Sequence, residues 1–226
     1  MKPVVLKLSG ELLTSDMACV KGILGNIKKL LSTHRISIVI GGGNLFRGQK
    51  EGRALGLRPA VADTVGMLAT VMNGLVLKEL LICEGVDAVV LNAYAIPGVV
   101  DQISQMALDA CQKQGSVVIF TGGTGNPFVT TDTCAIIRAL QVGAREIWKA
   151  TKVEGIYDAD PVVNSSAQLI KKVTYDDVLQ QHLGVLDATA VALARHHTIR
   201  IRIFSLFTPN ALLSVAGDPS FGSSIE

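Results

Sequence analysis

Three charged residues stand where they could handle a phosphate group. Lys7 lies inside an otherwise apolar run, Arg47 lies in the segment NLFRG, and Asp132 closes the segment GGTGNPFVTTD. A buried lysine is costly unless an anion meets it, and arginine can hold a phosphate through two parallel hydrogen bonds. Asp132 cannot attract a phosphate, so it would either hold a metal ion or pair with Lys7 and orient it. This set suits phosphoryl transfer, because catalysis of that reaction consists mostly of positioning and charge neutralisation.

Two glycine-rich segments add backbone donors to this set. GGGN covers 41–44 and GGTGN covers 122–126. Glycine lets backbone N–H groups turn toward an anion, and a helix start, here capped by Thr130 or Thr131, adds unpaired donors. Neither segment matches GxxxxGK[ST] or GxGxxG, so the sequence disfavours a P-loop and a Rossmann dinucleotide site. The competing interpretation of both segments is a pair of ordinary tight turns.

The elements that would position these residues alternate between strand and helix patterns. Apolar, β-branched runs predict strands at 3–8, 36–40, 86–91, 116–120, 146–150 and 199–204. Helical patterns lie at 17–34, 62–85, 101–114, 131–143, 175–182 and 188–197. Most of the strand runs lack polar alternation, as parallel strands covered on both faces do. The sequence therefore predicts one α/β domain over residues 1–226, a three-layer α/β/α sandwich with a mostly parallel central sheet.

The glycine- and threonine-rich clusters each follow one of these strands directly. SGE follows the first strand, GGGNLFRG the second, TGGTGNPFVTTD the fourth and TKVEGIYDADP the fifth. Ligands of open α/β sheets bind outside the carboxyl ends of the strands. We therefore expect these clusters to form one site at that edge of the sheet.

Composition narrows the choice of partners and compartment. The chain is 49% hydrophobic with a formal net charge of +2, which gives no broad attraction to nucleic acid or membrane. The first apolar run is too short for a signal peptide, and no stretch approaches the roughly 20 apolar residues of a membrane span. The four cysteines are isolated in the sequence. We expect them to be small buried hydrophobes in a reducing cytoplasm.

The segments KLSGE, GGGNLFRG, ADTVGMLATVMNGL, GTGNPFVTTD and KATKVEGIYDADP, in this order, closely resemble the bacterial uridylate kinases (UMP kinases) of the amino acid kinase fold. The matching segments lie within residues 3–204. GTGNPF, TTD and ATKV-x-G-x-Y-x-ADP together separate this family from its carbamate kinase, aspartokinase and acetylglutamate kinase relatives. The resemblance implies transfer of the γ-phosphoryl group of ATP to UMP, with Mg²⁺, by a cytoplasmic homohexamer.

The resemblance also implies roles for individual residues. Lys7, Arg47 and Asp132 would be catalytic, with Asp132 organising the lysines or a metal ion at the point of transfer. The ATP side would consist of Lys7, Leu8, Ser9, Gly10, Gly43, Arg47, Thr151, Lys152, Tyr157 and Asp160. The UMP side would consist of Gly42, Arg47, Asp63, Gly123, Thr124, Gly125, Asn126, Pro127, Phe128, Val129 and Thr130.

Some residues near these segments have simpler interpretations. Asp63 could simply cap the helix at 62–85, without a role in binding, and Tyr157 could be a packed loop aromatic. Asp101 starts a helical pattern, and we assign it capping alone. Asp158 and Asp160 precede a proline and could be ordinary turn residues.

Lys149 and Lys152 stand three positions apart, so we expect one of them to face solvent. We favour Lys152 as the residue that belongs to the site.

Two other functions use the same residues. One is a phosphotransferase of this fold with a carboxylate or carbamate acceptor. The other is a non-catalytic nucleotide- or anion-binding protein, which should have lost Lys7, Arg47 or Asp132. The sequence also departs from the family pattern at Val129, where a second Phe is usual. The segment before the helix at 17–34 is short, and many members carry an insert there that helps to bind an activating GTP.

Overall fold

The computed structural model describes residues 1–159, 161, 163–164, 166–181 and 183–226. In this part of the chain one large sheet has the strand order β4-β3-β5-β2-β1-β6-β10-β11-β9, and β7 pairs with β8 in a small second sheet. The strands are β1 (Lys2–Leu8), β2 (His34–Ile40), β3 (Ala88–Asn92), β4 (Asp101–Gln102), β5 (Val117–Thr121), β6 (Glu146–Thr151), β7 (Ile156–Tyr157), β8 (Leu169–Ile170), β9 (Lys172–Val173), β10 (Arg200–Ser205) and β11 (Ser223–Ile225). The helices are α1 (Met17–Leu30), α2 (Pro59–Cys83), α3 (Gln105–Gln114), α4 (Thr131–Val142), α5 (Tyr175–Gln180), α6 (Ala188–His197) and α7 (Ala211–Gly217), with the short η1 (Gly10–Thr14) and η2 (Gly48–Gly52).

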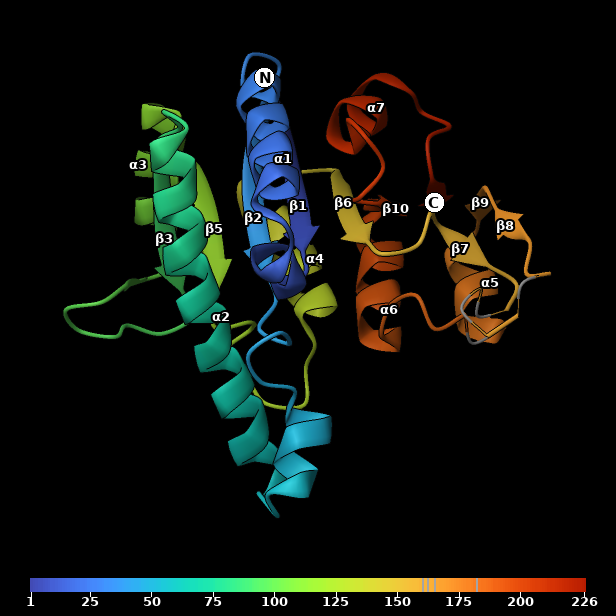
Figure 1. Ribbon diagram of the computed structural model, residues 1–226, viewed down its shortest axis with the longest axis horizontal. Helices are drawn as coiled ribbons and strands as arrows, with labels where there is room; N and C mark the ends of the chain where they lie inside the picture. Colours follow the sequence, from blue (N-terminus) through green and yellow to red (C-terminus); the bar gives the residue numbers. More distant parts are fainter. Residues whose placement is uncertain (160, 162, 165, 182) are drawn as a thin grey trace.

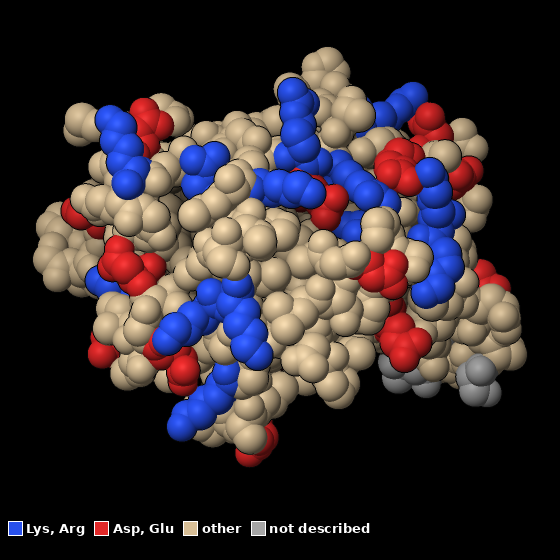
Figure 2. Space-filling view, turned by 90° about the horizontal axis from the view of Figure 1, so that it is seen from above, with Lys and Arg blue, Asp and Glu red and all other residues tan. Residues whose placement is uncertain are grey.

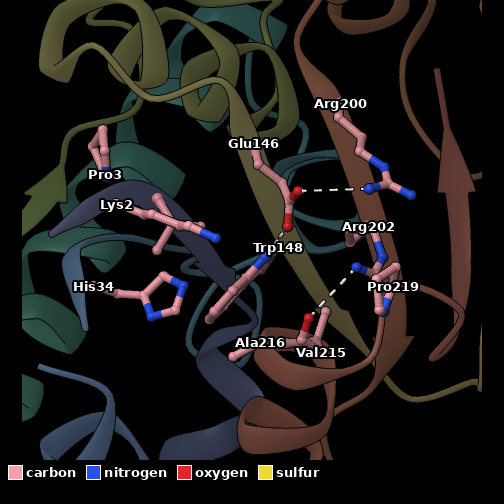
Figure 3. A pocket seen from close by; sticks show the side chains of 11 residues that line it. Lys2, Pro3, His34, Glu146, Trp148, Arg200, Arg202, Val215, Ala216 and Pro219 are labelled. Carbon is pink, nitrogen blue, oxygen red and sulfur yellow. Dashed lines mark hydrogen bonds and ion pairs between the residues drawn. The ribbon is translucent and has the colours of Figure 1, made fainter. Parts of the chain in front are cut away.

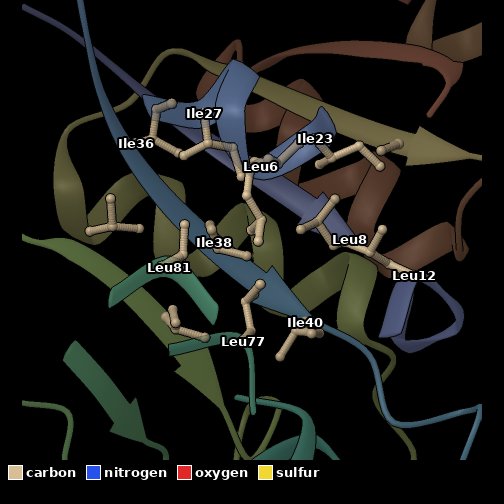
Figure 4. Packing of buried hydrophobic residues seen from close by; sticks show 14 of the residues in the cluster. Leu6, Leu8, Leu12, Ile23, Ile27, Ile36, Ile38, Ile40, Leu77 and Leu81 are labelled. Carbon is tan, nitrogen blue, oxygen red and sulfur yellow. The ribbon is translucent and has the colours of Figure 1, made fainter. Parts of the chain in front are cut away.

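Helices cover both faces of the large sheet and make three layers (Figure 1). Side chains alternate along β1, so Leu6 enters a core with α1, α2 and α7, whereas Val5 enters a core with α3, α4, α5 and α6. In the first core, Ile38 of the sheet packs among Ile27 of α1 and Leu77 of α2 (Figure 4). Truncating one such side chain to Ala would cost about 2–5 kcal/mol. The predicted α/β sandwich is confirmed.

The order of the strands places the ligand-binding edge. Strands β1, β2, β3, β5, β6 and β10 are parallel to their neighbours among this set, and β11 runs antiparallel to β10. The chain builds the sheet on one side of β1 as far as β5 and then crosses over to β6 on the other side. Strand order reverses between β1 and β6, and open α/β sheets bind ligands at such a switch point.

The elements match the predicted strand and helix segments, with differences at their ends. The helix predicted over 101–114 begins at Gln105, where the hydroxyl of Ser104 accepts from the N–H of Ala107. Asp101 instead lies in β4, which pairs with β3, so its predicted role as a helix cap is wrong. The chain stays extended there because the N–H of Ile103 donates to the carbonyl of Asn92.

The sequence pattern did not reveal β4, β7, β8, β9, β11 or α7. These strands are two or three residues long, and α7 has seven residues. Hydrophobic periodicity needs a longer window than that to distinguish a strand or a helix from a loop.

Helix α2 corrects the expectation that no stretch of the chain approaches the apolar length of a membrane span. It is long and apolar enough by composition to cross a membrane, with a mean hydropathy of 1.6 in its most apolar window. Its inner face nevertheless packs on β3 and β5 through Leu77 and Leu81, and Thr70 and Asn73 bond to loops at the sheet edge. The helix is therefore an integral layer of the domain. Cys83 at its end is exposed, against the expectation that the cysteines are buried.

Candidate active site

Lys7 of β1 and Lys149 of β6 lie side by side at the switch point, because the register of the two strands pairs them directly. Paired positions on parallel strands face the same side of the sheet, so both ammonium groups lie on the α4 side. Asp132 in the first turn of α4 lies between them. Its carboxylate is 3.1 Å from Nζ of Lys7 and 2.6 Å from Nζ of Lys149. All three side chains are largely buried, with 16%, 12% and 13% exposed for Lys7, Lys149 and Asp132.

The charges of this cluster do not cancel. Burial raises the pKa of Asp132. The ammonium groups of Lys7 and Lys149 together lower it by more than that, so the net shift is downward. Burial lowers the pKa of Lys149, and Asp132 offsets part of that effect. Oδ1 of Asp132 accepts no hydrogen bond among the described residues, so Lys7 meets it as an ion pair alone. Two cations share this one carboxylate, and Asp187 acts on Lys149 as a second, weaker anionic influence. The position is poorly hydrated, and an arriving phosphate would stabilise its cations.

A second carboxylate holds two cations at the surface of the same edge. Oε1 of Glu11 in η1 lies 2.6 Å from Nη2 of Arg47, and Oε2 lies 2.9 Å from Nζ of Lys152. The hydrogen bond from Lys152 lowers the pKa of Glu11 against the effect of burial. Here the cations are exposed, with 56% for Arg47 and 66% for Lys152.

The choice between the two neighbouring lysines was therefore wrong in one respect. Lys149 was expected to face solvent, yet it is the buried partner of Asp132, whereas Lys152 is exposed. The reason is the strand register, which pairs Lys149 with Lys7, while Lys152 lies just beyond the end of β6. A count along the sequence could not reveal that pairing.

The loop after β5 is held in shape from below. Gly122 and Gly123 have positive φ of 72° and 57°, and a Cβ on Gly122 would collide with the amide of Asn92. The N–H of Gly122 donates to Oγ1 of Thr70 at 2.7 Å, and the carbonyl of Gly123 accepts from Nη2 of Arg138 at 3.0 Å. The loop is thus fixed to α2 and α4 before any ligand arrives.

Part of the backbone of this loop is committed to the loop itself. The N–H of Gly125 donates to the carbonyl of Gly122 at 3.0 Å, and the N–H of Asn126 donates to Oγ1 of Thr124 at 3.2 Å. Together with Gly122, these amides are not available to a phosphate in this arrangement. The loop therefore offers fewer donors than its glycine content suggested. Thr130 caps α4 as expected, since its hydroxyl accepts from the N–H of Asp132.

The loop after β2 is clamped by α2. Nδ2 of Asn73 lies 2.7 Å both from the carbonyl of Gly41 and from Oδ1 of Asn44. Arg47 folds back over this loop, because its Nε donates to the carbonyl of Gly43 at 2.9 Å. The side chain of Arg47 therefore packs against Gly43, although it does not line the cavity between the loops in this arrangement.

Asp63 does not cap a helix. Helix α2 begins at Pro59, so Asp63 lies in its second turn. Its Oδ2 accepts from the N–H of Phe128 at 2.8 Å, and Phe128 has a left-handed φ of 66°, which is uncommon for a residue other than glycine. Asp63 thus joins α2 to the loop 122–130 across the mouth of the site.

A cavity of about 300 Å³ opens between these loops. The predicted residues that line it are Lys7, Ser9, Gly42, Gly43, Asp63, Gly123, Asn126, Val129 and Thr130. A wider cavity of about 850 Å³ shares Gly48, Asp63, Val129 and Thr130 with it, and Phe128, Lys50 and Arg53 also line that second space. Lys7 is the member of the buried cluster that lines the smaller cavity.

Other predicted residues lie at the same edge but outside the lining of this cavity. Leu8 is fully buried in the core, so only its backbone is left for a ligand. The hydroxyl of Thr151 donates to the carbonyl of Val153 at 2.7 Å, which fixes the turn after β6. Tyr157 is half-buried on β7, and Asp160 lies outside the described residues.

A metal ion at this site would be held mainly by the substrate phosphates. Among the described residues, no three His, Cys, Asp or Glu side chains stand close enough to hold one. Asp132 has one oxygen without a hydrogen bond, yet two ammonium groups flank it. These residues fit a Mg²⁺ ion that arrives on substrate phosphates, which is the usual arrangement for Mg²⁺ in phosphoryl-transfer sites.

Sequence reasoning missed four residues that build the site. Lys149 interrupts the apolar run EIWKA just as Lys7 interrupts the first strand, and that signal was readable. Glu11, Asn73 and Arg138 act through partners 15 to 141 positions away, and nothing local in the sequence marks them. Their contacts exist only once the helices lie on the sheet.

The parallel sheet, the paired lysines on one carboxylate and the two glycine loops define a phosphotransferase-type site. A model of the amino acid kinase family matches residues 2–205. The chain belongs to the amino acid kinase family.

Individual relatives share a narrower likeness. The chain is 43% identical to a uridylate kinase of Magnetococcus marinus, over 96% of this chain and 93% of that one. It is 40% identical to a uridylate kinase of Francisella tularensis, over 99% and 92%. The structure of UMP kinase from Ureaplasma parvum superposes with a TM-score of 0.93 at 34% identity, over 100% of this chain and 98% of that one. UMP kinase from Bacillus anthracis gives 0.93 at 30%, over 100% and 96%.

Proposed function

We propose that this protein is a nucleoside monophosphate kinase that transfers the γ-phosphoryl group of ATP to UMP, in the cytoplasm, as a step of pyrimidine nucleotide biosynthesis. The observation that carries the proposal is the buried cluster of Lys7, Lys149 and Asp132, whose Lys7 lines the cavity between the glycine loops. Uridylate kinases with about 40% identity along the chain support the choice of acceptor.

The acceptor phosphate would enter the cavity between the glycine loops. Arg47 and the backbone at Gly42 and Gly43 would hold its oxygens, and Lys7 would meet it at the inner end. Asp63 would receive the ribose hydroxyls at the mouth, where it already holds the N–H of Phe128. The segment 123–130 would then lie along the nucleotide.

The chemical step needs no general base. A phosphate monoester loses its second proton near pH 6, so an acceptor oxygen is already a nucleophile at neutral pH. It would form a bond to the γ-phosphorus while the bond from that phosphorus to the β–γ bridging oxygen breaks, and ADP leaves. The obstacle is repulsion between the phosphate groups, which the two buried ammonium groups reduce as charge moves. Asp132 would keep both ammonium groups in place.

The donor would approach from the side of β6. Ser9 and Gly10 would contact the ATP phosphates, with Lys152 reaching them from the exposed cluster. Thr151, Tyr157 and Asp160 would face the adenosine. A Mg²⁺ ion bound to the phosphates would supply further charge neutralisation, and Asp132 could give it one oxygen.

The apolar outer face of α2 supports self-association. Leu68, Met72 and Val76 stand four residues apart on one face of α2, and each is 42–59% exposed. Exposed apolar stripes of this kind mark interaction sites. We expect a homo-oligomer, a hexamer by the family resemblance, and light scattering of a Met72→Glu variant should report a smaller particle.

A coupled ADP-release assay tests the function. Purified protein with ATP and Mg²⁺ is offered UMP, CMP, dTMP, carbamate and acetylglutamate in turn. We expect turnover largely confined to UMP. Turnover on an acyl acceptor would move the specificity to another member of the family. Nucleotide binding without turnover on any acceptor would contradict the proposal and favour a binding protein.

A further inference from the structure

A third cavity lies at the opposite edge of the sheet, at the amino ends of β1, β2, β6 and β10. Its volume is about 220 Å³, and we call it the amino-edge cavity. The chemically active side chains that line it are Lys2, His34, Glu146, Trp148, Arg200 and Arg202 (Figure 3). Lys2 and Lys7 are five residues apart on β1, which separates this cavity from the active site by roughly 17 Å along the strand.

Arg202 lines this cavity with a guanidinium group that is buried without a carboxylate partner among the described residues. It is 2% exposed, and its guanidinium donates to the carbonyls of Asp218 and Phe221 at 2.8 and 2.7 Å. Its Nε finds no acceptor, and no carboxylate lies within ion-pair distance, among the residues that the structure describes. Buried arginines are normally paired with an acid. The carbonyls at the end of α7 offset only part of the charge.

The remaining charges of the amino-edge cavity leave a surplus of cations. Glu146 accepts from the indole Nε1 of Trp148 at 2.5 Å through Oε1, and its Oε2 lies 4.0 Å from Nη1 of Arg200. Arg200 also lies 3.1 Å from Glu226. Lys2 has no ion-pair partner in the described part of the chain, and its side chain reaches toward Trp148 in Figure 3. Lysine and arginine side chains gather on this face of the molecule (Figure 2).

We propose that the amino-edge cavity binds a small oxyanion of the phosphate class between Lys2, Arg200 and Arg202. The volume is below the roughly 300 Å³ at which pockets for drug-sized ligands begin, so it suits one phosphate group better than a whole nucleotide. The several oxygens of one phosphate can accept hydrogen bonds from an ammonium and a guanidinium at the same time. A chloride ion is a single atom and matches such a set of donors less well. The source is either inorganic phosphate or the phosphate group of a nucleotide.

Trp148 provides a direct readout, because it is the only tryptophan of the chain and lines this cavity. Its fluorescence would be titrated with inorganic phosphate, with UMP, and with potassium chloride at matched ionic strength. We expect a saturable change with phosphate and none with chloride. Lys2→Met should weaken phosphate binding about tenfold, as loss of a charged hydrogen bond does. Lys29→Met, which removes another exposed ammonium elsewhere, should not.

Further variants separate this site from the active site. Arg47→Ala should leave the phosphate response of Trp148 unchanged, and Lys2→Met should leave turnover unchanged. A response to UMP that depends on Lys2 would identify the phosphate group of a nucleotide as a ligand, and a response to phosphate alone would identify the free ion. The proposal is overturned if phosphate gives no saturable change, if Lys2→Met leaves the affinity for phosphate unchanged, or if the change disappears in Arg47→Ala.

Discussion

Two carboxylates at the carboxyl edge of the sheet each bridge two cations, yet their surroundings differ. Asp132 holds Lys7 and Lys149 on the sheet side of α4, where all three side chains are nearly buried. Glu11 holds Arg47 and Lys152 at the surface, where the cations are more than half exposed. The ion-pair distances are alike, between 2.6 and 3.1 Å.

Because of this difference in burial, we expect the ion pairs of Asp132 to persist and those of Glu11 to exchange with ligands. Exposed ion pairs contribute about 0–1 kcal/mol, so the partners of Glu11 can leave it for a phosphate at little cost. Removing one partner of a buried set costs about 3–5 kcal/mol, because a charge is left without compensation. The Asp132 cluster should therefore remain assembled through the reaction, whereas the Glu11 cluster should open when substrates bind.

The largest effect is expected at the buried carboxylate. Asp132→Asn should lower kcat by about 10²–10³-fold or more, because the two ammonium groups lose the charge that positions them. The KM values should change little. Steady-state kinetics measure this, with Asp109→Asn on the exposed face of α3 as the control and thermal melting to verify folding. A kcat within a few-fold of the parent would remove Asp132 from the reaction.

Lys149 and Lys152 provide a matched pair of variants, one in the buried cluster and one in the exposed cluster. Lys149→Met should lower kcat by about 10²-fold, whereas Lys152→Met should act mainly on the KM for ATP and by no more than about fivefold. Both variants remove one ammonium and keep a similar side-chain length. If Lys152→Met lowered kcat more than Lys149→Met, the comparison between buried and exposed clusters would be reversed.

A smaller and selective effect is expected at the mouth of the cavity. Asp63→Ala should raise the KM for UMP more than the KM for ATP, because Asp63 lines the acceptor cavity and holds the N–H of Phe128. We expect about a tenfold change, the loss of one hydrogen bond to a charged group. Initial rates at varied UMP and ATP decide this. Equal changes in both KM values would indicate that Asp63 only supports the loop.

The smallest effect is expected at Glu11. Glu11→Gln should lower the KM for ATP and UMP by no more than about fivefold, since the carboxylate no longer competes with phosphates for Arg47 and Lys152. The gain should shrink as salt concentration rises, because screening already weakens exposed pairs. A rise in both KM values would instead show that Glu11 orients the two cations for binding.

Much of this molecule was accessible from the sequence, because its signals are local. Unbroken apolar runs indicate strands covered on both faces, and the glycine clusters directly after them mark the carboxyl edge. Lys7, Arg47 and Asp132 stand out because a charge in or beside such a run needs a partner. The α/β sandwich and the site edge follow from these patterns.

The tertiary structure alone decided which side chains meet. The sequence preferred Lys152, but the register of β1 and β6 pairs Lys149 with Lys7 beneath α4. Asp63 was placed beside a helix start, but α2 begins earlier and turns it toward Phe128. Register and helix start depend on how a whole layer packs, and a single segment carries no record of its neighbours. The residue types therefore indicated phosphoryl transfer, whereas the packing of helices on the sheet determined which side chains lie together.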